Sequence, residues 1–235
     1  MTMAANGGHL SCVQYLHERG CEWNEKVCAR AAIEGHLHIL EYLHQHGCPW
    51  NEQATVEATQ SCNVDCLVYL HEHGCPVTAT AYYAAAMADD LRCVKYLHQN
   101  DCPWDARAGE GTAESNSVEI LTFLHENGYK FSEDCMPAAL QYGHLEAAKC
   151  LHELGCKLCP RACTHAVSGG NLECLKFVYE HGCTWTTETY NRALRVSNKA
   201  ILHFLGTQHC DGAPTFQAYL DANPSERLFL RNDAV

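Results

Sequence analysis

The chain has 235 residues, with 16 Lys or Arg against 28 Asp or Glu, and its formal net charge is −12. This acidic balance excludes a generic phosphate-binding surface, which needs clustered basic side chains. A hydrophobic fraction of 47% is enough for a folded core, and no apolar run reaches the roughly 18 residues of a membrane helix. The first residues show no signal-peptide pattern, so we expect a protein of the reducing cytoplasm.

A 27-residue period runs through the whole sequence. The dipeptide Leu-His recurs at that spacing from Leu16-His17 to Leu151-His152, without insertion or deletion. A column of cysteines has the same period: Cys21, Cys48, Cys75, Cys102, Cys156, Cys183 and Cys210, with Tyr129 in the remaining place. A period between 20 and 50 residues is typical of a stacked solenoid. We therefore predict one repeat domain over residues 1–235, with half repeats at both ends.

The second repeat, residues 24–50, shows what each unit contains. Asn24 is a favourable N-cap for a first helix over residues 25–34, and Gly35 suits the left-handed residue that ends it. A second helix with an apolar face is predicted to begin after His36. In later repeats the place of His36 holds other residues that favour N-caps: Asn63, Asp90, Ser117, Asn171 and Asn198. Each unit is therefore a pair of short helices that buries its apolar faces only by stacking.

These residues resemble the ankyrin repeat family. The family pattern is found here as Ala31-Ala32, Gly35-His36-Leu37, Ile39-Leu40, Tyr42-Leu43 and Gly47-Cys48. The family period is about 33 residues, and the missing part falls where ankyrins have a β-hairpin finger. The resemblance implies an all-α ankyrin-like solenoid with reduced or absent fingers, and a protein-binding role without catalytic residues or cofactors. The Leu-His-Glu and Gly-Cys-Pro-Trp motifs are similar to arrays in giant DNA viruses of amoebae and some protists.

The chain has 17 Cys and 16 His, which raises the question of metal binding. Cys12, Cys66, Cys93 and Cys174 share a column with isoleucines, which indicates buried apolar positions rather than ligands. The His17 column is expected to form a partly exposed ladder between units. The four Trp share another column and are expected to pack between repeats. We therefore predict no bound metal.

One cysteine and histidine cluster keeps the alternative open. It consists of His152, Cys156, Cys159, Cys163 and His165. These residue types are zinc ligands, and Cys159 stands where other repeats have a capping residue. However, the cluster spans the end of one helix and the start of the next, and no second CxxC accompanies it.

A variable stripe is predicted on the first helices. The Ala31 column is Ala in nearly every repeat, which indicates close helix contacts, whereas the Lys26, Arg30 and Ile33 columns change freely and share one helix face. In ankyrins this face lines the concave surface. The variable stripe, our predicted partner-binding set, comprises Lys26, Arg30, Ile33, Gln53, Glu57, Gln60, Met87, Arg107, Glu114, Asp134, Gln141, Tyr142, Arg161, His165, Glu188, Arg192 and Arg195. Neutral drift of solvated positions is the alternative.

Two segments depart from the pattern. Gly109 and Gly111 lie inside a first helix, and Pro137 lies near the start of the next, so the softest point is expected between Asp105 and Pro137. Residues 216–222 are expected to form a last first helix, and residues 224–231 a shortened capping helix. Since Met1 falls inside a first helix, the chain is either part of a longer array or has an eroded first repeat.

We expect a monomeric, non-enzymatic protein–protein interaction scaffold with a protein partner, in the host cytoplasm if the source is viral. No phosphate-binding loop and no recurring Asp or Asn beside a His is present, which argues against an enzyme. Two alternatives stay open. One is an adaptor that recruits a partner to ubiquitin ligase machinery as part of a longer protein, and the other is a metal-binding protein based on Cys and His.

Overall fold

The computed structural model describes residues 1–208 and 215–222, and these residues contain helices and turns but no strand. The first helices of the repeats are α1 (Thr2–Asn6), α3 (Glu25–Ile33), α5 (Glu52–Gln60), α7 (Ala79–Met87), α9 (Ala106–Glu114), α11 (Cys135–Gln141), α13 (Ala162–Ser168), α15 (Thr187–Val196) and α17 (Phe216–Ala222). The second helices are α2 (Leu10–Glu18), α4 (Leu37–Gln45), α6 (Val64–Glu72), α8 (Leu91–Gln99), α10 (Val118–Glu126), α12 (Leu145–Glu153), α14 (Leu172–Glu180) and α16 (Lys199–Thr207). The predicted all-α repeat architecture, with no finger strands in the described residues, is confirmed.

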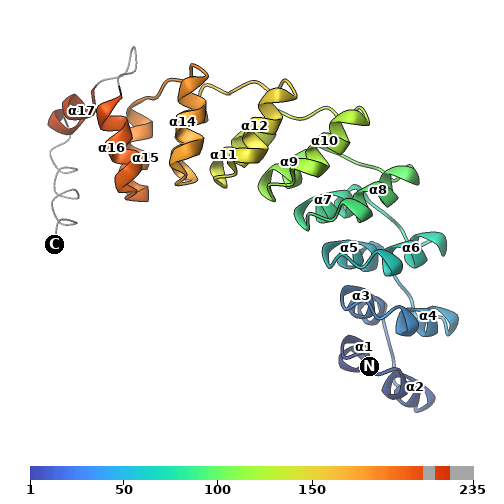
Figure 1. Cartoon of the computed structure of the whole chain (residues 1–235). Coiled ribbons are helices and arrows are strands. Elements are labelled where there is room, and N and C mark those ends of the chain that lie inside the picture. The colour runs from blue at the N-terminus through green and yellow to red at the C-terminus, as the bar shows by residue number, and fades with distance from the viewer. Residues whose placement is uncertain (209–214, 223–235) are drawn as a thin grey trace. The chain divides into compact units, whose positions relative to one another are not determined.

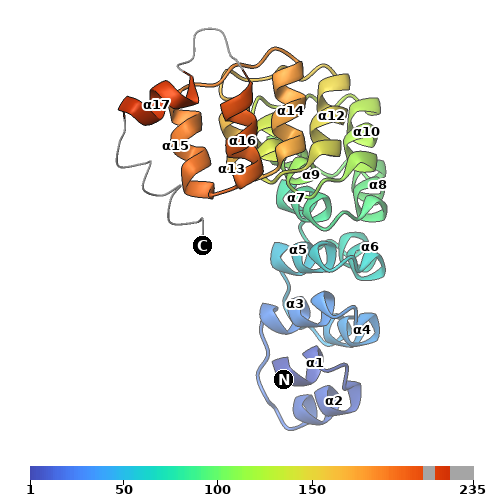
Figure 2. The ribbon, with the colours of Figure 1, turned by 60° about the vertical axis from the view of Figure 1, so that its left-hand side comes forward.

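The chain divides into two compact units, Met1–Leu124 and His125–Val235. In the first unit α3, α5 and α7 form one row and α4, α6 and α8 a second row (Figure 1). In the second unit α11, α13 and α15 pack in sequence. The second helices α12, α14 and α16 form a row beside them (Figure 2). The division falls inside the segment 105–137, where the sequence predicts the softest point. That softness itself stays a prediction.

The apolar core follows the repeat columns. Ala31, Ala58 and Ala85, which occupy the small-residue column of the first helices, have no exposed surface, because adjacent first helices meet there. The second helices bury the leucines of the Leu-His pairs, such as Leu43 and Leu70, just as fully. Burying such side chains contributes about 1.5–3 kcal/mol each. Within the described part of the chain, no helix is both long and apolar enough to cross a membrane.

The predicted side-chain caps form at the start of α3, α5 and α9. The side-chain oxygens of Asn24, Asn51 and Asp105 accept hydrogen bonds from backbone N–H groups two residues later, at 3.2, 3.0 and 3.0 Å. Thr78 makes no such bond, so the capping prediction is wrong there. Gly35, with φ of +71°, ends the first helix of its repeat as predicted.

Two first helices begin two residues late. In α11, Pro137 would remove a helical hydrogen bond and clash with the carbonyl of Glu133 if the helix began at Glu133. Because α11 begins at Cys135, the proline instead falls in the first turn, where the N–H has no partner within the helix. In α13, which begins at Ala162, the N-cap residue is Arg161 and not Cys159, and no side chain caps the helix.

The N-terminal residues of the second helices have a second role that the sequence did not predict. The Nδ2 group of Asn63 donates to the carbonyls of Ala32 and Ile33 at 3.0 and 2.8 Å, in the preceding repeat, and does not cap its own helix. Asn171 does both, since its Oδ1 accepts from its own helix and its Nδ2 donates to the Gly143 carbonyl. These amides tie the end of one first helix to the next repeat.

One expectation about a cysteine needs correction, and one glycine has a packing role. Cys12 is exposed although its column is buried elsewhere, because no second helix covers that side of α2 in the structure. Gly111 does not shorten α9, which keeps nine residues. A Cβ atom at Gly111 would lie 3.0 Å from the ring of Tyr83 and 3.2 Å from the Cβ of Ala86, so a larger residue there would force α7 or the Tyr83 ring to shift by a few tenths of an ångström.

Candidate partner-binding surface

The first helices place the whole variable stripe at the surface. Successive stripe positions lie three or four residues apart and therefore on one helix face, while the alanine column faces the neighbouring first helices. Thirteen of the seventeen stripe residues are exposed and the other four, Ile33, Glu57, Glu114 and His165, are half-buried. None is needed to fill the core. Their role in partner binding stays a prediction, which the geometry below makes specific.

In the first unit, the stripe borders an open depression of about 490 Å³ on α3 and α5. Lys26 and Arg30 stand on one side of it, and Gln53 and Glu57 on the other. The Nε2 of Gln53 donates to Glu57 at 2.8 Å, which fixes both side chains. The depression therefore has two cations, Lys26 and Arg30, and two carboxylates, Glu25 and Glu57, among its lining residues.

The stripe continues over α7 and α9 with a mixed surface. Met87 is 39% exposed, which is unusual for a large apolar side chain. Arg107 pairs with Asp105 at 2.7 Å, and hydrogen bonds from Arg107 hold the pKa of Asp105 below its usual value. The hydroxyl of Tyr83 donates to Glu114 at 3.4 Å, so a tyrosine outside the predicted set also reaches this surface.

In the second unit, α13 and α15 bring stripe residues together around a smaller cavity of about 140 Å³. Arg161 pairs with Glu188 at 2.6 Å, and His165 and Arg192 line the same cavity. Burial lowers the pKa of His165, and the charge of Arg161 lowers it further, so the imidazole is neutral near pH 7. Tyr142, at the end of α11, is 57% exposed.

The structure separates the members of the possible zinc cluster. His152 packs against Phe177 and His181, while His165 lies at the cavity of α13 and α15. The thiol of Cys163 donates to the Cys183 carbonyl at 3.5 Å, and the other two cysteines line a separate cleft. Among residues 1–208 and 215–222, no group of three or more His, Cys, Asp or Glu is placed to hold a metal ion.

Three of the four cysteines that share a column with isoleucine, Cys66, Cys93 and Cys174, are buried. Burial raises the pKa of Cys66 and of Cys174 to about 11, which suppresses the reactive thiolate. Both act as small apolar side chains, as their alternation with isoleucine predicts.

Comparison with known proteins identifies part of the chain. A family model described as ankyrin repeats (3 copies) matches residues 1–81. Residues 1–81 are ankyrin repeats. Such repeats indicate a protein–protein interaction scaffold, and the ankyrin-repeat fold is typically non-catalytic. A search of curated proteins finds no match.

Solved structures extend the fold beyond these ankyrin repeats. The human ASB11 ankyrin repeat domain is similar at a TM-score of 0.57 and 19% identity, over 67% of this chain and 84% of that chain. The maize pentatricopeptide repeat protein PPR10, in complex with an 18-nt psaJ RNA element, is similar at a TM-score of 0.53 and 12% identity. That match covers 99% of this chain and 43% of PPR10. At these identities, the likeness shows the fold alone.

A polar ladder on the second helices of the first unit is more regular than the sequence indicated. Three hydrogen bonds join successive repeats, each between a His Nδ1 and a Tyr hydroxyl: His17 with Tyr42 at 2.9 Å, His44 with Tyr69 at 3.0 Å, and His71 with Tyr96 at 2.9 Å. Trp23 and Trp50 stack on His17 and His44, with ring centroids 4.1 Å apart in each pair. The columns were visible in the sequence, but the bonds join residues 25 apart, which the 27-residue period alone does not reveal.

Proposed function

We propose that the chain is a non-enzymatic protein-binding scaffold whose partner contacts the variable stripe of the first helices. The observation that carries the proposal is the contrast within each first helix. The alanine column is fully buried, as Ala85 and Ala139 show, whereas every stripe residue reaches the surface. The fold therefore constrains one set of positions and leaves the other free for recognition.

Protein is the partner class that we favour over nucleic acid. PPR10 was solved with RNA, but the present chain has a net charge of −12, and an RNA surface needs many cationic contacts to phosphate. The exposed Met87 and Tyr142 instead suit contact with an apolar protein surface. The stripe arginines add groups that are frequent at binding hot spots.

Matched charge pairs test this proposal by affinity capture from a lysate of the source cells, followed by mass spectrometry. Arg107→Ala on α9 is compared with Lys95→Ala on α8, and Arg195→Ala on α15 with Lys149→Ala on α12. Each comparison removes one positive charge within the same unit, once from a first helix and once from a second helix. We expect the arginine variants to lose capture by about tenfold or more and the lysine variants to retain it. Equal loss in both sets would reject the stripe as the binding surface.

The adaptor role in ubiquitin ligase machinery is a narrower version of this proposal. It predicts that ligase subunits are captured together with the partner by the longer protein. Capture of the partner without such subunits would leave the scaffold proposal standing and remove the adaptor role.

A further inference from the structure

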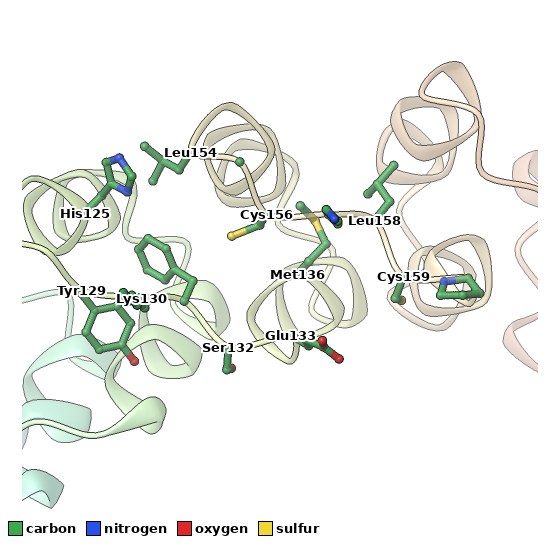
Figure 3. A pocket seen from close by; sticks show the side chains of 14 residues that line it. His125, Tyr129, Lys130, Ser132, Glu133, Met136, Leu154, Cys156, Leu158 and Cys159 are labelled. Carbon is green, nitrogen blue, oxygen red and sulfur yellow. The ribbon is translucent and has the colours of Figure 1, made fainter.

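A cleft of about 640 Å³ lies between two successive inter-repeat loops of the second unit. One side is formed by the residues after α10, and the other by the residues between α12 and α13. Figure 3 shows Leu154 and Cys156 on one side of it, with His125 and Tyr129 on the other. None of the residues that line the cleft belongs to the variable stripe. Its volume lies in the range of sites that hold small ligands or short peptide segments.

The cleft arises from the late starts of α11 and α13. In the ankyrin repeats at the N-terminus, a helix such as α5 begins directly after its capping residue, Asn51. In the two repeats at the cleft, the turn before the helix is two residues longer, because α11 begins at Cys135 and α13 at Ala162. The chain thus forms two wider loops at adjacent positions of the array, and the cleft lies between them.

The floor of the cleft is apolar. It includes Phe131, Met136, Leu154 and Leu158. Phe131 and Leu158 stand in the column where four other repeats have Trp. Smaller side chains at these two positions leave apolar surface without the bulky ring that packs over it elsewhere, as Trp50 packs on His44. An apolar side chain from another molecule would therefore be stabilised here.

The rim of the cleft carries two lysines that the repeat pattern does not require. Lys130 and Lys157 replace the proline of the Gly-Cys-Pro turn, which other repeats keep at Pro49, Pro76 and Pro103. Both lysines are exposed, and neither forms an ion pair with any residue that the structure describes. Glu133 is the one carboxylate among the lining residues. In a chain with a net charge of −12, this cleft therefore concentrates positive charge beside an apolar floor.

We propose that the cleft binds an extended segment of a protein partner in which a large apolar side chain is followed by Asp or Glu. The apolar side chain contacts the half-buried Phe131, Leu154 and Leu158, and the carboxylate pairs with Lys130 or Lys157. Met136, which lines the same cleft and is 1% exposed, reports on occupation of the site. Because both lysines are solvent-exposed, each ion pair adds little to the binding affinity. The pairs instead favour acidic segments over neutral or basic ones. This is a second binding site, on the loops, in addition to the first-helix surface proposed above.

Methionine methyl NMR tests this site directly on the full chain. The protein is labelled with ¹³C at the methionine methyl groups, and the acetylated, amidated peptide Gly-Leu-Glu-Glu-Gly is titrated. We expect the Met136 signal to shift in a saturable way, while Met87, on the first-helix surface, stays in place. The same peptide with both Glu replaced by Gln should bind about fivefold more weakly.

Matched variants distinguish the effect of the two cleft lysines from the effect of the net charge of the protein. Lys130→Gln combined with Lys157→Gln should weaken binding of the Glu peptide by about fivefold and bring it to the level of the Gln peptide. Lys95→Gln combined with Lys149→Gln removes the same charge from second helices and should leave binding unchanged. No saturable Met136 shift, equal affinity for the two peptides, or equal shifts at Met136 and Met87 would overturn the proposal. The peptide comparison uses the unmodified protein, so its outcome does not depend on the folding of any variant.

Discussion

At the scale of single residues, the His–Tyr ladder shows what happens when one partner of a repeated pair changes. His152 continues the histidine column, but Phe177 stands where the ankyrin repeats have the tyrosine. The Nδ1 atom of His152 is buried and has no hydrogen-bond partner among the described residues. A buried polar atom without a partner costs about 1–3 kcal/mol. The single missing hydroxyl therefore leaves a local weakness in the second unit.

Phe177→Tyr should repair this weakness. The new hydroxyl lies in the place from which Tyr42 reaches His17, so we expect a gain of about 1 kcal/mol in the free energy of unfolding, measured by urea denaturation. Phe204→Tyr is the matched control, because Phe204 faces Tyr179 and not a histidine. An equal gain in the control would show that the hydroxyl acts without the imidazole.

The ladder also predicts a pH dependence of stability. Burial lowers the pKa of His44, and the nearby His73, whose ring centroid lies 5.1 Å away, lowers it further. The unfolded chain, with an ordinary histidine pKa of about 6.5, then binds more protons than the folded chain below that pH. The stability that this group contributes is present above about pH 6.5 and is lost as the pH falls through the lowered pKa.

His73→Asn tests the coupling, because Asn100 occupies the same column and donates to the Tyr96 carbonyl at 2.8 Å, as His73 does to the Tyr69 carbonyl. Urea midpoints at pH 7.5 and pH 5.5 should differ less in this variant than in the unmodified protein. The same acid-induced loss in both proteins would remove His73 as a cause.

At the scale of helices, the sequence was sufficient to predict element type and order. The columns placed the caps of α3, α5 and α9, the left-handed Gly35 and the alanine contact, because each has a local physical cause. The sequence was not sufficient to predict the contacts between repeats. The bonds from Asn63 to the preceding repeat depend on how the helices stack, and capping propensity does not report that. The cleft beside α11 was missed for the same reason, although Pro137 correctly indicated a late helix start.

The alanine column gives a prediction at this scale. Ala85→Leu on α7 should overpack the contact between first helices and lower the free energy of unfolding by about 1–3 kcal/mol. Met87→Leu on the same helix changes an exposed side chain and should alter stability by less than about 0.5 kcal/mol. Thermal or urea unfolding would measure both. If the two substitutions had equal effects, the assignment of a buried and a free face would be wrong.

At the scale of the whole molecule, an array of short helix pairs gains its stability from contacts between neighbouring repeats. The fold class and the 27-residue register were predictable from the sequence because the same pattern of residues recurs in every repeat. The identity of the partner was not, since the residues that recognise it are those that the pattern leaves free. The division near Leu124 was only indicated, through the glycines of α9 and through Pro137.

The abundance of Cys and His does not require a structural metal in this account. Treatment of the purified protein with EDTA should leave the thermal transition where it was, because Cys66, Cys93 and Cys174 are buried and no group of three or more potential ligands converges among the described residues. A fall of several degrees that zinc reverses would show that metal stabilises the array and would revive the zinc-binding alternative.

Hydroxyl-radical footprinting of the chain with and without its captured partner tests the central claim most directly. Three of the exposed large side chains serve as reporters: Met87 on α7 is 39% exposed, Tyr142 at the end of α11 is 57%, and Tyr15 on the second helix α2 is 54%. If the partner binds the first-helix surface, it protects Met87, Tyr142 or both from oxidation and leaves Tyr15 as reactive as before. Protection of Tyr15 alone, with Met87 and Tyr142 unchanged, would contradict a first-helix binding surface.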